Sequence, residues 1–310
     1  DGDGIEADKT EAARYFKMAA DKGDLDSMFN YAIMLNSGEG IEENKVEAAR
    51  YCKMAADKDH LNAMYGYAFM LLCGQGVNVN KQKAARYYKK AADKGYDKAM
   101  INYAVMLDEG DGIPVNKKEA TRYIKMAADN GNAEAMASYG FRLSKGEGVS
   151  VNQKEAARYY KMAADNGAGD AMYNYARMLE KGDKGVSRNK KEAARYYKLA
   201  ADSGVVSGMN NYAVMLDNGD GVPVNKVEAA RYFKIAADNG HVDAMFNYAN
   251  MLDTGDGIQA NKPEAAHYYK MAADNGNVSA MKNYSIMLSK GDGIPVNKKD
   301  AAKYLKMSKK

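Results

Sequence analysis

Residues capable of nucleophilic or metal chemistry are few in this chain of 310 residues. Its three histidines, His60, His241 and His267, lie far apart and none belongs to an H-x-x-x-H pair, so a metal site is not expected. Cys52 and His60 could be read as a nucleophile and its base. A predicted helix end separates them, however, and their spacing matches no recognised catalytic geometry. We therefore expect a packed cysteine and a loop histidine, with no enzymatic activity and no cofactor.

Glycine-rich segments raise two further possibilities, phosphate binding and calcium binding. A Gly-x-Gly turn such as Gly255-Asp256-Gly257 occurs at regular intervals, but it follows a predicted helix instead of a strand and lacks a third spaced glycine. Turn geometry is the better interpretation. The segment Asp1-Gly2-Asp3-Gly4 resembles part of a calcium loop, yet its glycine falls in the wrong place and no ligating set follows.

The turns recur because the chain is a tandem repeat. The stretch Asn225–Ala260 has near copies throughout the sequence, and the Asn-Lys pair that opens it returns every 36 residues in most copies. One step, from Asn152 to Asn189, is 37 residues long because Lys184 is inserted in the turn. We expect that loop to bulge or the flanking helices to stack differently, with a local change of superhelical pitch.

Each copy predicts a pair of antiparallel helices. In the first helix, Asn225 can cap the N-terminus and Glu228 can complete a capping box. Alanines and tyrosines at helical spacing give this helix a buried face, and its lysines and arginines lie on the other face. The second helix has its own apolar face, which includes Met245, Tyr248 and Leu252.

This pattern resembles the Sel1-like repeat family, relatives of the tetratricopeptide repeats. The residues that carry the resemblance are Asn247-Tyr248-Ala249 with Met251-Leu252, then Gly255-Asp256-Gly257-Ile258, then the segment from Glu264 to Gly276. The resemblance covers the whole chain and implies an all-α fold, an α-solenoid in which 36-residue antiparallel helix pairs form a right-handed superhelix. It also implies a scaffolding role, since such proteins act as adaptors in membrane-protein quality control, signalling and host–microbe contact.

We expect residues 1–310 to form a single solenoid of about eight repeats plus a C-terminal helix. Nine first-type helices should begin near Lys9, Lys45, Lys81, Lys117, Gln153, Lys190, Lys226, Lys262 and Lys298. The opening segment Asp1-Gly2-Asp3-Gly4-Ile5 has the sequence of a turn that ends a second-type helix. The chain is therefore expected to begin within a repeat, as a segment of something longer.

The net charge of +4 and a row of arginines and lysines on the first-type helices permit two interpretations. Such a row could meet nucleic acid or anionic lipid. Alternatively it is a solvated face of ion pairs, because Glu228 precedes Arg231 by three residues and Asp238 follows Lys234 by four. Most copies repeat this pairing. We favour the solvated face and do not expect a nucleic-acid partner.

The cysteine content bears on the compartment. Cys52 and Cys73 fall in one repeat and cannot build the regular disulfide framework of a secreted protein, so a reducing, cytoplasmic compartment is expected. A disulfide between the two stays open as an alternative. No apolar run approaches membrane-spanning length, and no secretory signal is visible.

Two positions of the second-type helix vary freely between copies: the residue after the core methionine and the residue four later. The pairs are Phe29/Ile33, Tyr65/Phe69, Ile101/Val105, Ala137/Phe141, Tyr173/Arg177, Asn210/Val214, Phe246/Asn250 and Lys282/Ile286. The resemblance implies that this helix lines a concave groove, so that the varied residues face a ligand. Alternatively, large side chains here pack between neighbouring repeats.

We therefore predict a non-enzymatic scaffold or adaptor that binds a protein or peptide partner along its concave face. The candidate partner-binding residues are Phe29, Ile33, Tyr65, Phe69, Ile101, Val105, Phe141, Tyr173 and Arg177. An amphipathic helix or an apolar peptide segment would lie along the stretch from Phe29 to Phe141, with any acidic portion extending toward Arg177. The alternative is a structural spacer or lattice component that contacts partners through its ends or convex face.

Overall fold

The computed structural model describes residues 8–309, which form seventeen α-helices and no strand. The helices alternate between the two predicted types, and the all-α fold class is confirmed. The first-type helices are α1 (Lys9–Asp21), α3 (Lys45–Asp57), α5 (Lys81–Asp93), α7 (Lys117–Asp129), α9 (Gln153–Asp165), α11 (Lys190–Asp202), α13 (Lys226–Asp238), α15 (Lys262–Asp274) and α17 (Lys298–Met307). The second-type helices are α2 (Leu25–Ser37), α4 (Leu61–Cys73), α6 (Asp97–Glu109), α8 (Ala133–Lys145), α10 (Gly169–Lys181), α12 (Val206–Asn218), α14 (Val242–Thr254) and α16 (Val278–Lys290). The opening Asp-Gly segment and its expected turn lie outside the described residues.

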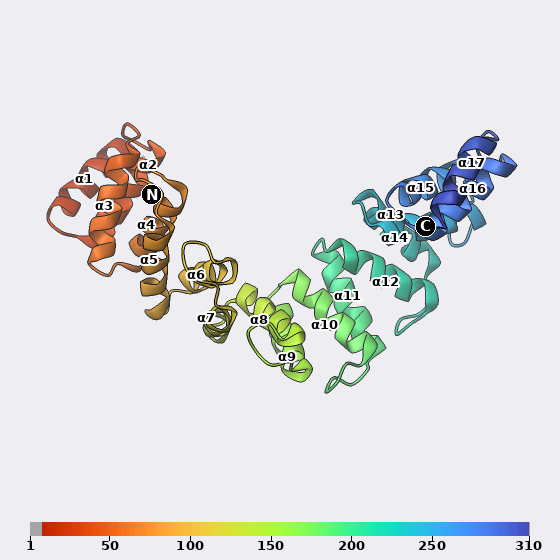
Figure 1. The fold of residues 1–310 in the computed structure, drawn as a ribbon, viewed down its shortest axis with the longest axis horizontal. Coiled ribbons are helices and arrows are strands. Elements are labelled where there is room, and N and C mark those ends of the chain that lie inside the picture. Colours follow the sequence, from red (N-terminus) through yellow and green to blue (C-terminus); the bar gives the residue numbers. More distant parts are fainter. Residues whose placement is uncertain (1–7, 310) are drawn as a thin grey trace. The chain divides into compact units, whose positions relative to one another are not determined.

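The chain divides into two compact units, Asp1–Asn152 and Gln153–Lys310. The first unit contains α1 to α8 and the second contains α9 to α17. Within each unit a helix packs mainly on the helices before and after it in the chain, which run antiparallel to it (Figure 1). Each unit is therefore a solenoid of stacked helix pairs, in which every repeat is supported by its neighbours. That residues 1–310 form one continuous solenoid stays a prediction.

Asparagine caps tie consecutive helices together. At the start of α13, the Asn225 side chain accepts a hydrogen bond from the Glu228 backbone N–H at 3.1 Å, as predicted. The second half of the predicted capping box is different. The Asn225 backbone N–H donates to the Leu216 carbonyl of α12 at 2.9 Å, so the Glu228 carboxylate accepts from the Asn225 side-chain amide instead. The cap thus fixes the end of one helix against the start of the next.

A ladder of tyrosine–aspartate hydrogen bonds joins successive first-type helices. Each tyrosine hydroxyl donates to the last aspartate of the first-type helix one repeat earlier, over 2.5 to 3.2 Å. The pairs are Tyr51–Asp21, Tyr87–Asp57 and Tyr123–Asp93 in the first unit, and Tyr196–Asp165, Tyr232–Asp202, Tyr268–Asp238 and Tyr304–Asp274 in the second. We call this set the Tyr–Asp ladder. It links repeats through residues about 30 positions apart.

Edge-to-face packing of aromatic rings supports the ladder. The Tyr123 ring, which is fully buried, meets the ring of Tyr103 on the preceding second-type helix edge-on, with centroids 5.0 Å apart. The same arrangement recurs through both units, as between Tyr248 and Tyr268 at 4.9 Å. Alanines on the same first-type helices are fully buried and allow the close helix approach that this packing needs, as Ala120 does on α7.

The Gly-x-Gly turns are explained by backbone geometry. Gly74 and Gly76 follow α4 with φ of 70° and 67°, a region that favours glycine. A Cβ on Gly76 would come within 1.9 Å of the Lys45 carbonyl oxygen at the start of α3. The turn after a second-type helix therefore closes directly onto its partner helix, and only glycine leaves the space for it.

The inserted residue Lys184 stays within its loop. The Asn189 backbone N–H still donates to the Leu179 carbonyl at 2.8 Å, the distance between Asn80 and Leu71 in a repeat of ordinary length. The rings of Tyr175 and Tyr196 remain edge-to-face at 4.8 Å across the longer step. These contacts favour the expected bulge, and they show no altered stacking of the two helices beside the loop.

Asp59 is the one non-glycine residue with positive φ among residues 8–309, at 71°. It stands between α3 and α4, at the position where other repeats have a glycine such as Gly95 with φ of 91°. A left-handed backbone is strained for a residue with a Cβ. Ion pairs from the Asp59 carboxylate to Lys90 at 2.7 Å and Lys94 at 3.1 Å offset part of this strain.

We expect Tyr123→Phe to lower the free energy of unfolding by about 1–2 kcal/mol, because the Asp93 carboxylate loses a hydrogen bond from a buried hydroxyl. Tyr15→Phe is the matched control, since Tyr15 occupies the same repeat position but is 56% exposed. Urea unfolding followed by circular dichroism measures both. Equal changes in the two variants would show that the hydroxyls of the ladder do not stabilise the stack.

We expect Asp59→Gly to raise the free energy of unfolding by about 1 kcal/mol, because glycine removes the left-handed strain. The lost ion pairs are about half exposed and should contribute less than this. The same urea titration tests it. A lower urea midpoint in the variant would mean that the ion pairs to Lys90 and Lys94 stabilise the fold by more than the left-handed backbone of Asp59 destabilises it.

Candidate functional site

The two residues of each varied pair lie in different environments. In the first unit the first residue of the pair is half-buried, as Phe29, Tyr65 and Ile101 are. The second residue is more exposed, with exposed fractions of 46% for Ile33, 44% for Phe69 and Val105, and 43% for Phe141. These four exposed side chains, one on each of α2, α4, α6 and α8, are called the apolar row.

Contacts to the next repeat explain the burial of the first residue. The Tyr65 ring lies 5.5 Å from the ring of Tyr88 and 5.6 Å from that of Tyr96. The Phe29 ring lies 5.4 Å from the His60 ring. Packing between repeats, one of the two interpretations from the sequence, therefore describes the first residue of the pair. The second residue has the exposure that the ligand-facing interpretation requires.

Tyr173 and Arg177 belong to α10 in the second unit. The Tyr173 ring packs on the next repeat as its counterparts do, with its centroid 5.9 Å from that of Tyr197. The exposed Arg177 guanidinium lies 5.7 Å from the Tyr173 ring centre, a cation–π contact within the varied pair.

Four candidate residues meet at one cavity in the first unit. Phe29 and Ile33 of α2 and Tyr65 and Phe69 of α4 line a cavity of about 520 Å³, which we call the α2–α4 pocket. Ile101, Val105 and Phe141 are not among its lining residues. Most of its wall is apolar and aromatic, which is typical of sites that bind small apolar groups or anchor side chains.

The lining also includes residues that the sequence did not predict. Cys52 and Gly66 line the α2–α4 pocket, together with the polar side chain of Asn36. Other copies of the repeat have a larger residue at the position of Cys52 and asparagine or serine at the position of Gly66. A comparison of the copies at these two core positions, instead of the surface positions alone, would have indicated the cavity.

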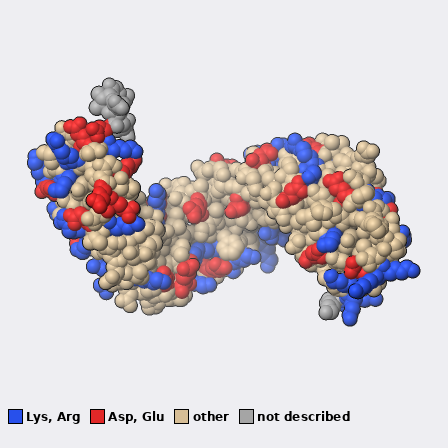
Figure 2. All heavy atoms as spheres, turned by 90° about the horizontal axis from the view of Figure 1, so that it is seen from above, with Lys and Arg blue, Asp and Glu red and all other residues tan. Residues whose placement is uncertain are grey.

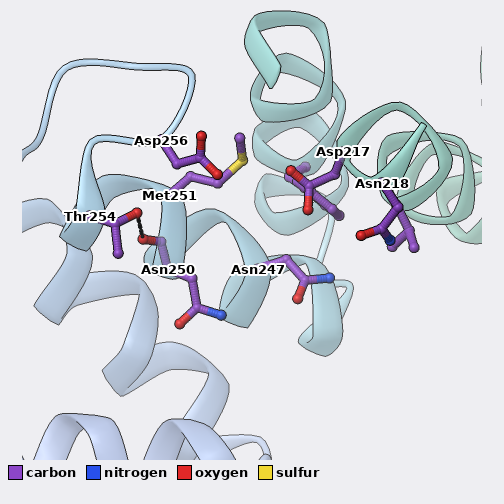
Figure 3. A pocket seen from close by; sticks show the side chains of 9 residues that line it. Asp217, Asn218, Asn247, Asn250, Met251, Thr254 and Asp256 are labelled. Carbon is purple, nitrogen blue, oxygen red and sulfur yellow. Dashed lines mark hydrogen bonds between the residues drawn. The ribbon is translucent and has the colours of Figure 1, made fainter. Parts of the chain in front are cut away.

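The second unit has an equivalent cavity between α12 and α14, which we call the α12–α14 pocket (Figure 3). Its volume is about 200 Å³, and Phe233 and Asn247 occupy the positions of Cys52 and Gly66. Asp217 of α12 and Asn250 of α14 give it a polar wall. The same place on the repeat is therefore larger and apolar in the first unit, and smaller and polar in the second.

Cys52 and His60 make structural contacts. Cys52 is buried, which raises the pKa of its thiol to about 12, and its Sγ donates to the Ala63 carbonyl at 3.3 Å. Cys73 is exposed and both thiols are free. His60 lies in the loop between α3 and α4, as expected, and its Nδ1 accepts from the Ala63 backbone N–H at 3.1 Å, which caps α4. Its Nε2 lies 2.9 Å from the Asp26 carboxylate.

Within residues 8–309, no group of three or more His, Cys, Asp or Glu side chains is arranged to hold a metal ion. The same part of the chain contains no helix that is long and apolar enough to cross a membrane.

Ion pairs cover the lysines in the basic row of the first-type helices, and glutamate–arginine pairs of the predicted kind form between Arg50 and Glu47 and between Arg158 and Glu155. The lysines pair with the aspartate four residues later: Lys17–Asp21, Lys53–Asp57, Lys89–Asp93, Lys125–Asp129, Lys161–Asp165, Lys198–Asp202, Lys234–Asp238 and Lys270–Asp274. Figure 2 shows basic and acidic side chains interspersed over much of the face in view. These pairs match the solvated face that the sequence favoured.

A family model described as "Sel1 repeat" matches residues 1–24, 25–60, 61–96, 97–132, 133–167, 169–205, 206–241, 242–277 and 278–310. The fold is similar to that of c5321, a protective antigen present in uropathogenic Escherichia coli strains, with a TM-score of 0.91 and 26% identity. That alignment covers 96% of this chain and 64% of the other, so this chain spans less than two thirds of that protein. A Sel1 repeat protein from Oxalobacter formigenes gives a TM-score of 0.75 at 23% identity, over 96% of this chain and 85% of the other. No curated protein sequence matches the chain.

We expect Phe69→Ser and Phe141→Ser to lower the free energy of unfolding by about 1 kcal/mol or less each, because nearly half of each side chain is already exposed to water. Tyr67→Ala, which removes a ring that is 4% exposed on the same helix as Phe69, should lower it by about 3 kcal/mol or more. Chemical unfolding of the three variants gives the comparison. A loss for Phe69→Ser as large as that for Tyr67→Ala would place Phe69 in the core between repeats.

Proposed function

The chain belongs to the Sel1 repeat family, and on this basis we propose that it is a non-enzymatic scaffold that holds a peptide or partner domain along its second-type helices. The first unit supplies most of the proposed contact surface: the half-buried Phe29, Tyr65 and Ile101 and the apolar row beside them. Tyr173 and Arg177 are a separate candidate contact within the second unit. The partner's identity is not part of the proposal.

The apolar row is the observation that supports this function. Four large apolar side chains, each between 43% and 46% exposed, recur at one repeat position on consecutive second-type helices. Covering such side chains with apolar groups of a partner is favourable by about 25 cal/mol for each Å² removed from water. A peptide with apolar residues spaced to match successive repeats would cover them all.

The alternative role, a spacer or lattice component, would place the contacts elsewhere. It needs contact through the ends or through the first-type helices, whose exposed face carries the lysine–aspartate ion pairs. Exposed ion pairs contribute little to association because water already solvates them. A spacer would not require a row of exposed phenylalanine, isoleucine and valine side chains. The apolar row on the second-type helices therefore favours a scaffold.

The test is to select peptides from a displayed library against the full chain and to measure their affinity for variants. We expect Phe69→Ser combined with Phe141→Ser to weaken the selected peptides by about 2 kcal/mol or more, the scale of losing a central contact. Met18→Ser combined with Val46→Ser is the matched control, because Met18 is 48% and Val46 68% exposed, but on first-type helices.

Unchanged affinity in the double phenylalanine variant, together with a loss in the control pair, would contradict the proposed surface. That result would move the contact to the first-type helices and support the spacer role. Circular dichroism of each variant separates a loss of binding from a loss of fold.

A further inference from the structure

The α2–α4 pocket exists where two side chains of the repeat are replaced by small ones. At the position of Cys52, the other first-type helices carry tyrosine, phenylalanine, isoleucine or leucine. At the position of Gly66, the other second-type helices carry asparagine or serine. Where phenylalanine and asparagine fill these positions, in the α12–α14 pocket, the cavity is about 200 Å³ instead of about 520 Å³. The α2–α4 pocket thus lacks the aromatic ring and the carboxamide that fill the α12–α14 pocket.

Gly66 keeps the space beside Cys52 open. A Cβ on Gly66 would lie 3.3 Å from the Cys52 Sγ and 3.4 Å from Cε2 of Phe29. Any larger side chain at this position would therefore grow into the gap between those two residues. The backbone conformation does not call for glycine here, because Gly66 lies within α4 and its φ is not positive. The glycine contributes volume to the pocket.

Asn36 supplies a polar atom with no partner. Its side chain lines the α2–α4 pocket, and its Oδ1 is buried without a hydrogen bond from any described residue. A buried amide oxygen without a donor is unfavourable by about 1–3 kcal/mol, so such atoms are rare in folded chains. The residue that carries this unpaired atom lines a pocket whose wall is mostly apolar and aromatic.

The equivalent residues in the second unit show which group fits this atom. Tyr197 occupies the position of Cys52, and its hydroxyl donates to the Glu180 carboxylate at 2.6 Å. Glu180 occupies the position of Asn36. Burial and this carboxylate both raise the pKa of the Tyr197 hydroxyl, which keeps it a donor. In the first unit the acceptor remains, while the phenol that would pair with it is missing.

Tyr88 shows the opposite mismatch. It carries the phenol at the position of Cys52 in the next repeat, but Leu72 stands at the acceptor position. The Tyr88 hydroxyl is accordingly buried without a hydrogen bond. Tyr197 and Glu180 thus show one arrangement in which a phenol at the ring position pairs with the acceptor position. Acceptors in other repeats have other donors, such as Arg142 for Asp108 and Lys226 for Asp217. Asn36 Oδ1 has none among the described residues.

We propose that the α2–α4 pocket binds the side chain of a tyrosine from a peptide partner. The phenol ring occupies the space left by Cys52 and Gly66, against Phe29 and Tyr65, and its hydroxyl pairs with Asn36. A phenolic hydroxyl both donates and accepts, so it can pair with either end of the Asn36 amide. The inference rests on the proposed scaffold function and names the anchor residue that the partner supplies.

The experiment uses para-cresol, which is the tyrosine side chain as a free molecule, and toluene, which has the same ring without the hydroxyl. Both are titrated into the full chain while the methionine methyl signals are followed by NMR, because Met70 lines the pocket. We expect para-cresol to bind about tenfold more tightly than toluene, the effect of one hydrogen bond to a buried acceptor.

Variants assign the binding to this pocket. Cys52→Tyr combined with Gly66→Asn gives this repeat the residue pair that the next repeat has in Tyr88 and Asn102, and it should remove binding of both compounds. Asn36→Leu copies Leu72 and should weaken para-cresol to the affinity of toluene. Cys73→Ser changes the exposed cysteine, which does not line the pocket, and should leave both affinities unchanged.

The proposal is overturned if para-cresol does not bind, if toluene binds as tightly, or if the Cys52→Tyr and Gly66→Asn variant binds para-cresol like the unmodified chain. Its failure is distinct from failure of the scaffold function. Phe141 does not line the pocket, so a loss of peptide affinity in Phe141→Ser alone supports the scaffold whatever the cresol result is.

Discussion

The Tyr–Asp ladder is the interaction on which the stacking of repeats depends. One hydroxyl from each repeat reaches the last aspartate of the first-type helix before it, and that aspartate also accepts from a lysine one turn earlier in its own helix. Hydrogen bonds from Lys234 and Tyr268 lower the pKa of Asp238, while burial and Asp238 raise the pKa of Tyr268 to about 12. The lowered pKa keeps the Asp238 carboxylate ionised, and the raised pKa keeps the Tyr268 hydroxyl protonated. The hydroxyl can therefore donate to a charged acceptor near neutral pH.

The ladder occupies the first-type helices and so leaves the second-type helices free to vary. Tyrosine, aspartate and lysine must keep their spacing on the first-type helix, because each takes part in contacts within its helix and to the next repeat. On the second-type helix, the methionine, tyrosine and leucine of the core make contacts that restrict them in the same way. The exposed second residues of the varied pairs, such as Phe69, are less restricted. The side chains at these positions can therefore differ from repeat to repeat while the repeats still pack on one another.

This division explains why the two units differ at the same place on the repeat. In the first unit, Cys52 and Gly66 leave a large apolar cavity beside two exposed side chains of the apolar row. In the second unit, Phe233 and Asn247 fill the space, and the Asp217 carboxylate is held by Lys226 at 2.7 Å. A small number of substitutions inside a fixed framework is therefore enough to create a site in one repeat and remove it in another.

The sequence alone determined the helix pairs, their asparagine caps, the turns and the lysine–aspartate pairs, because each depends on residues within a few positions of one another. It also singled out Phe69 and Phe141 as varied positions. It left open which member of a varied pair is exposed, since residues four apart share one helix face and only the approach of the next repeat buries one of them. The α2–α4 pocket likewise depends on tertiary structure, because it forms only where helices from neighbouring repeats meet. Asn36, Cys52 and Gly66 come from three helices, and a missing ring becomes a cavity only when those helices pack around it.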